Sequence, residues 1–186
     1  MHDTAMRTGA AFFAIYGKLF DKPRILDVGA FNVNGTLRSV APEGSSYTGI
    51  DLTAGDGVDL VVAAGDRFPF DDGSFDLTVS TSCFEHDPMF WVTFVEMARV
   101  TKPGGFLYIS APSNGPYHGH PGDCWRFYSD AAEALANWAK RNDQPIDLVE
   151  TFMMPPKYDI WTDNVMVYGK APISGHGRPL ADAMRV

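Results

Sequence analysis

The chain has little cysteine, few basic residues and no long apolar run. Cys83 and Cys124 are its two cysteines, so a disulfide framework and a four-cysteine zinc site are excluded. No apolar stretch approaches the roughly 18 residues of a membrane span, and we expect a cytoplasmic protein without membrane contact. Fifteen lysines and arginines stand against 23 acids. This net negative charge disfavours non-specific binding to nucleic-acid phosphates.

The chain also lacks internal repeats and any linker that would divide it. Its 186 residues suit one ordinary domain. We predict a single domain over residues 1–173, which begins with a helical segment over residues 1–22. Residues 174–186 are polar and contain glycine and proline, and they predict a loosely attached C-terminal tail.

Short apolar strands alternate with helical segments along the chain. This alternation predicts an α/β domain with a mainly parallel sheet, in which ligands bind beyond the carboxyl ends of the strands. The predicted helices cover residues 8–19, 89–100 and 131–140. The predicted strands cover residues 24–29, 47–52, 58–63, 75–81, 105–111, 146–152 and 164–169.

The first two strands end in residues suited to a nucleoside-containing ligand. Gly29 allows a close backbone approach after the first strand, and Gly35 is expected to open a helix. The segment lacks the G-x-G-x-x-G fingerprint, so an ordinary strand-to-helix turn stays open. Asp51 ends the second strand, where an acid accepts both hydroxyls of a ribose. A solvated capping aspartate is the alternative.

The third and fourth strands are joined by an acidic turn. Asp66 follows the third strand and is placed to accept a hydrogen bond from an adenine amino group; an ordinary loop acid is the alternative. The acids between residues 71 and 76 are interpreted as solvated turn residues.

Five motifs stand in a fixed order: ILDVG at 25–29, YTGID at 47–51, GDRFPFDDGSFDLTVS at 65–80, EHD at 85–87 and RVTKPGGFLYISAP at 99–112. Together they resemble the class I S-adenosylmethionine-dependent methyltransferases, most closely the type-11 methyltransferase-domain group, over residues 24–130. The departure is AFNVNG at 30–35, which stands where the family has a glycine-rich loop.

The resemblance implies a Rossmann-like fold with a seven-stranded, mostly parallel sheet, helices on both faces and an antiparallel last strand. It implies S-adenosyl-L-methionine as cofactor, with Asp51 on the ribose, Asp66 on the adenine and the loop from Asp27 to Asn32 on the methionine moiety. The predicted cofactor-binding residues are Asp27, Gly29, Ala30, Phe31, Asn32, Asp51, Leu52, Asp66, Arg67 and Ser82.

Two histidine-containing segments are candidates for the acceptor side. Methyl transfer needs an aligned acceptor and, for some acceptors, a base that removes a proton. We predict His86 and His118 as catalytic; for His86, a helix-capping role of the EHD segment is the alternative. The predicted acceptor-binding residues are His120, Trp125, Arg126 and Tyr128.

The second segment, residues 113–128, has two other interpretations. Its aromatic side chains would pack the loop onto the sheet while Arg126 bridges to an acid. His118, His120, Cys124 and Asp123 are also metal-ligand types, but the H-x-H-x-x-x-C spacing matches no closed zinc motif, and we predict no metal.

The predicted function is O- or N-methyl transfer to a small-molecule or sugar-type acceptor. A non-catalytic partner or scaffold subunit with the same fold is the alternative. An NAD-dependent oxidoreductase also places an acid after the second strand, but the missing fingerprint and substrate domain disfavour it. The sequence leaves a homodimer or a partner protein open.

Overall fold

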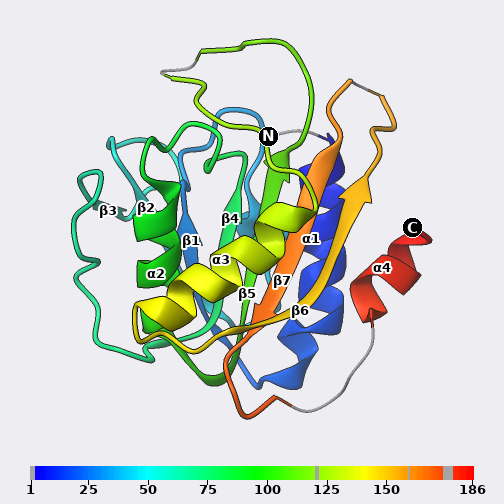
Figure 1. The fold of residues 1–186 in the computed structure, drawn as a ribbon. Coiled ribbons are helices and arrows are strands. Elements are labelled where there is room, and N and C mark those ends of the chain that lie inside the picture. Colours follow the sequence, from blue (N-terminus) through cyan, green and yellow to red (C-terminus); the bar gives the residue numbers. More distant parts are fainter. Residues whose placement is uncertain (1–2, 120–121, 159, 174–177) are drawn as a thin grey trace.

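A seven-stranded sheet forms the centre of the computed structural model, which describes residues 3–119, 122–158, 160–173 and 178–186. The strand order is β3-β2-β1-β4-β5-β7-β6 (Figure 1). Strands β1 to β5 pair in parallel, and β7 runs antiparallel to both β5 and β6. This topology confirms the predicted fold. The strands are Arg24–Val28 (β1), Ser46–Asp51 (β2), Leu60–Val61 (β3), Phe75–Thr81 (β4), Thr101–Pro112 (β5), Asp147–Met154 (β6) and Asp163–Gly169 (β7).

Helices cover both faces of the sheet. Helices α2 and α3 lie on one face and α1 on the other (Figure 1), and each face has its own apolar core. Strand β4 is buried along its whole length, as a central parallel strand between two helical layers must be. The helices are Asp3–Ile15 (α1), Phe90–Val100 (α2), Asp130–Arg141 (α3) and Pro179–Met184 (α4), with 3-10 helices at Gly17–Leu19 (η1) and Leu37–Val40 (η2).

Two predicted elements are shorter than expected. The helix expected from Gly35 is the single 3-10 helix η2, because Ala41 precedes Pro42 and adopts an extended conformation. The third strand keeps only Leu60 and Val61, which are both exposed at the edge of the sheet. The polypeptide between β1 and β4 is therefore mostly loop.

The C-terminal segment is not loosely attached where the structure describes it. Helix α4 contains Leu180 and Ala181, which are fully buried. The carboxylate of Glu150 in β6 accepts hydrogen bonds from both of their backbone amides, at 3.1 and 2.9 Å. Packing against α1 and β6 thus fixes this helix to the same face of the sheet as the N-terminal helix. Among the described residues, no helix has the length and apolar character of a membrane span.

Candidate active site

A small cavity opens at the carboxyl ends of β1 and β4. Its volume is about 60 Å³, well below the roughly 300 Å³ of a pocket that encloses a whole small molecule. The cavity therefore suits one end of a larger ligand. Its walls are Asp27, Gly29, Ala30, Phe31, Val33, Gly35, Thr36, Thr81 and Ser82. Five of the predicted cofactor-binding residues are among them.

Gly29 is required where the cavity meets the end of β4. Its φ angle is +83°, and a Cβ atom there would lie 2.5 Å from the Cβ and Sγ of Cys83. The amides of Gly29 and Ala30 both donate to the carbonyl of Ile50, at 3.0 and 3.1 Å. The loop after β1 is thus held between β2 and the end of β4.

Asp27 places a buried carboxyl group in the wall of the cavity. The hydroxyl of Tyr47 donates to it at 2.7 Å. Burial raises the pKa of Asp27 to about 6, while the Tyr47 hydrogen bond and the charge of Arg38 oppose that rise. The group is suited to accept a hydrogen bond from a cationic or N–H donor.

Asp51 faces the same loop from the end of β2. Its carboxylate accepts from the amides of Phe31 at 3.1 Å and Thr53 at 3.3 Å. Asn32 donates from its side chain to Asp56 at 2.6 Å, which ties the loop after β1 to the loop after β2. Leu52 is exposed beside them. The loop that replaces the glycine-rich segment is therefore an ordered structure.

Ser82 has a strained backbone at the end of β4. Its φ angle is +47°, in the left-handed region that favours glycine. Its buried hydroxyl has no hydrogen-bond partner among the described residues. A strained residue with an unpaired hydroxyl in a cavity wall is suited to bind a ligand.

Asp66 and Arg67 lie beyond β3 and are exposed. Arg67 forms an ion pair with Asp72 at 3.3 Å. Neither residue lines the cavity. The predicted cofactor-binding residues at the ends of β1, β2 and β4 thus lie closer to one another than to Asp66 and Arg67.

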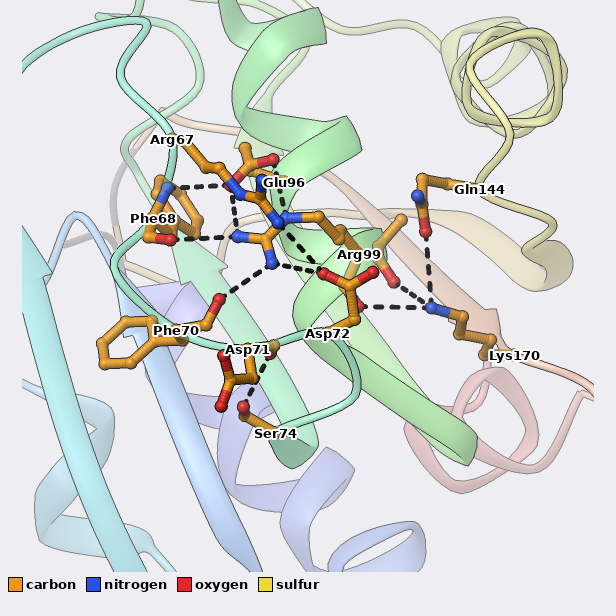
Figure 2. A network of polar contacts seen from close by, with 11 residues as sticks. Arg67, Phe68, Phe70, Asp71, Asp72, Ser74, Glu96, Arg99, Gln144 and Lys170 are labelled. Atoms are coloured by element: carbon orange, nitrogen blue, oxygen red, sulfur yellow. Dashed lines mark hydrogen bonds and ion pairs between the residues drawn. The ribbon is translucent and has the colours of Figure 1, made fainter.

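The loop after β3 is held by Arg99, in the last turn of α2 (Figure 2). Its guanidinium donates to the carbonyls of Phe68 at 3.0 Å and Phe70 at 2.8 Å, and it pairs with Asp72 and Glu96, both at 2.7 Å. Asp72, expected as a solvated turn acid, is thus one partner of a structural network.

Residues 122–125 of the loop after β5 lie against the segment that follows β4. The amide of Cys124 donates to the carbonyl of Glu85 at 2.7 Å. The indole N–H of Trp125 donates to the carbonyl of Asp87 at 2.9 Å, and Nδ1 of His86 is hydrogen-bonded to the carbonyl of Gly122. The two predicted acceptor segments are therefore in direct contact.

Arg126 organises this loop from inside. It forms a two-pronged ion pair with Asp123 and donates to the carbonyls of Pro116 at 2.9 Å and Trp125 at 2.7 Å. The Arg126 guanidinium holds the pKa of Asp123 far below its usual range. Asp123 also accepts from the amide of His118 at 2.8 Å and lies 3.0 Å from its Nδ1. The structure thus gives Arg126 the bridging role that the sequence left as the alternative.

The aromatic residues of this loop differ in their surroundings. Phe127 is buried, and Trp125 packs on the ring of Phe90 with centroids 5.3 Å apart. Tyr128 is exposed. His120 lies outside the described residues, so its predicted role stays a prediction.

Sequence reasoning missed Glu85, although it stands next to His86. Its side chain is fully buried, and burial raises its pKa to about 8. Nε2 of His86 lies 3.6 Å from its Oε1, and the rings of His86 and His118 are 5.0 Å apart. The EHD motif was the available signal, but nothing in three polar residues reveals which one is buried.

The fold and the cavity define a Rossmann-like domain with a ligand site at the carboxyl edge of its sheet. Residues 26–109 match the model of a methyltransferase-domain family. An uncharacterized methyltransferase of Mycobacterium marinum is 31% identical over 155 residues, which are 77% of this chain and 60% of that protein. The core of the chain, residues 26–109, therefore matches a methyltransferase-domain family, and the chain spans about 60% of the length of this relative.

Solved structures share the fold at low sequence identity. One is a Burkholderia thailandensis 1,6-didemethyltoxoflavin-N1-methyltransferase with bound 1,6-didemethyltoxoflavin and S-adenosylhomocysteine. It has a TM-score of 0.66 and 19% identity, covering 89% of this chain and 78% of that one. Another is the [4+2]-cyclase SpnF, with a TM-score of 0.66 and 15% identity, covering 91% and 82%. A shared fold therefore leaves the reaction to be argued from the site.

Proposed function

We propose that the protein binds S-adenosyl-L-methionine at the carboxyl ends of β1, β2 and β4 and transfers its methyl group to a small-molecule acceptor. The observation that carries this proposal is the cavity beside Gly29, whose wall includes the carboxyl of Asp27 and the unpaired hydroxyl of Ser82. Its small volume suits the amino-acid end of the donor. Asp51, at the end of β2, is then placed for the ribose hydroxyls.

The reaction is an in-line displacement at the donor methyl carbon. The bond from sulfur to carbon breaks and its electron pair stays on sulfur, which leaves S-adenosylhomocysteine. A lone pair on an acceptor oxygen or nitrogen forms the new bond to carbon, and the acceptor proton passes to a base. His86 and His118 lie together after β4 and β5, with ring centroids 5.0 Å apart. We assign both to the acceptor; His118 lies in the loop that Arg126 holds, and His86 lies in the segment after β4.

Calorimetric titration with S-adenosylmethionine, S-adenosylhomocysteine and NAD tests the donor site. We expect both adenosyl ligands to bind and NAD not to bind. Asp51→Ala removes charge-assisted hydrogen bonds and is expected to weaken S-adenosylhomocysteine binding by about 1–3 kcal/mol. Asp71→Ala, in an exposed turn away from the cavity, is the matched control and should retain wild-type affinity.

Two results would contradict the proposal. Equal affinity in Asp51→Ala would remove the ribose assignment. Absence of binding by either adenosyl ligand would favour the alternative of a non-catalytic partner subunit with the same fold.

A further inference from the structure

The acceptor side contains a buried carboxylate that no hydrogen bond explains. Glu85 has no solvent-exposed surface, and neither of its side-chain oxygens has a hydrogen-bond partner among the described residues. Burying an unpaired carboxyl group costs several kcal/mol unless a ligand compensates it. Glu85 stands two residues after Cys83, which packs on Gly29 of the donor loop. Glu85 therefore belongs to the segment that packs on the donor loop.

His86 and His118 lie near Glu85, and Nδ1 of each ring has a hydrogen-bond partner. Nδ1 of His86 is bonded to the carbonyl of Gly122, and Nδ1 of His118 lies 3.0 Å from the carboxylate of Asp123. These acceptors place the ring proton on Nδ1 and make Nε2 the ligand nitrogen of each ring. A histidine that binds a metal ion usually donates its other ring N–H to a carbonyl or a carboxylate.

The ligand atoms are already close. One atom each from Glu85, His86 and His118 lies within 4.8 Å of the others, and Nε2 of His86 is 3.6 Å from Glu85 Oε1. Around a tetrahedral zinc ion, neighbouring ligand atoms are roughly 3.4 Å apart. Side-chain movements of little more than an ångström therefore complete such a site.

The charges around Glu85 favour a cation. The negative charges of Asp163 and Asp123 act on Glu85, and the positive charge of Arg126 opposes them. Arg126 is already paired with Asp123 in its two-pronged ion pair. The Glu85 carboxyl group, which has no hydrogen-bond partner among the described residues, would therefore be stabilised as a carboxylate by a bound cation.

We propose that Glu85, His86 and His118 form a binding site for a divalent first-row transition-metal ion such as Zn²⁺. Two imidazoles and one carboxylate are a ligand set for zinc and its neighbours, and three protein ligands leave a coordination position open. That position faces the acceptor side, so an acceptor oxygen that binds there becomes easier to deprotonate. This last step rests on the proposed methyl transfer, whereas the metal site does not. It replaces the sequence-based expectation of no metal.

Titration of the purified protein with Co²⁺, a coloured substitute for Zn²⁺, tests the site without donor or activity. We expect visible absorption bands that saturate at one equivalent and that Zn²⁺ abolishes. Loss of an outer-shell partner alone costs about 10–100-fold in metal affinity, so Glu85→Gln, which removes a ligand oxygen, should weaken Co²⁺ binding by more than about 100-fold. His118→Asn should do the same, since it removes a ligand nitrogen.

A matched variant separates this site from the other ligand set of the loop. Cys124→Ser, at an exposed thiol, should retain wild-type Co²⁺ affinity; loss of binding would overturn the assignment. Absence of saturable binding to the wild type, or equal affinity in Glu85→Gln, would also overturn it. Near-ultraviolet circular dichroism and S-adenosylhomocysteine affinity on the same samples confirm that each variant is folded. They also distinguish failure of the metal site from failure of the donor site.

Discussion

Two buried ionisable side chains lie near opposite ends of helix α2 and differ in their partners. Arg99, in the last turn, donates to two carbonyls and pairs with two acids (Figure 2). Glu85, just before the helix, has no hydrogen-bond partner among the described residues. A buried ionisable group whose hydrogen bonds are satisfied holds a loop in place. One without a hydrogen-bond partner has an energetic cost that a ligand site explains.

Asp27 is intermediate between these two. It is buried in β1 and accepts one hydrogen bond, from Tyr47. It also lines the cavity that we assign to the donor. The three residues thus form a series of decreasing hydrogen bonding, from Arg99 through Asp27 to Glu85. The substitutions below test whether their effects on stability follow the same order.

Arg99→Met is expected to have the largest effect, because it removes the guanidinium that pairs with Glu96 and donates to two carbonyls. Breaking a buried ion pair costs about 3–5 kcal/mol. Since Asp72 is 68% exposed and can return to water, we expect the lower end, a loss of about 3 kcal/mol. Urea denaturation measures the free energy of unfolding.

Arg67→Met is the matched control, because it removes another arginine that pairs with Asp72. Its side chain is 72% exposed, so its loss should change the free energy of unfolding by less than about 0.5 kcal/mol. Equal effects of the two substitutions would show that the network around Arg99 does not stabilise the fold.

Asp27→Asn is expected to change how stability depends on pH. Burial raises the pKa of Asp27 from 3.8 to about 6, so the folded state holds this proton more tightly than the unfolded state does. The resulting stabilisation is full below pH 3.8 and is lost as the pH rises to about 6. The shift corresponds to about 3 kcal/mol. The free energy of unfolding of Asp27→Asn should therefore fall less than that of the wild type between pH 4 and pH 7.

Tyr47→Phe keeps the Asp27 carboxyl group and is expected to raise its pKa further. It removes the hydrogen bond that lowers the pKa of Asp27, so the loss of stability should extend to higher pH than in the wild type. Parallel pH curves for the wild type and Asp27→Asn would mean that Asp27 does not couple to folding.

The candidate residues at the strand ends could be predicted from the sequence, because the order of the elements determines where the strands end. A continuous apolar run such as β4 is typical of a central parallel strand, and ligands of such sheets bind beyond the carboxyl ends. Gly29 and Asp51 follow from this rule, Asp27 was implied by the family resemblance, and all three lie around one loop in the structure.

The acceptor side could not be predicted in the same way. Glu85 is buried because the loop containing Gly122 and Cys124 folds back over it, through contacts between residues almost 40 positions apart. The pairing of Arg126 with Asp123 depends on the same loop. Local patterns do not contain such long-range packing, so candidate residues could be named there from the sequence but their partners could not.

Among the substitutions of the three buried residues, Glu85→Gln is expected to have the smallest effect on stability. The pKa of Glu85 is raised to about 8 by burial, so at pH 7 without metal the carboxyl group is mostly protonated. Glutamine replaces this neutral group with a neutral group of the same shape, and no hydrogen bond is lost. The free energy of unfolding, measured at pH 7 with a chelator, should change by less than about 1 kcal/mol. A loss as large as that of Arg99→Met would mean that Glu85 is ionised and paired, and the contrast between the two ends of α2 would fail.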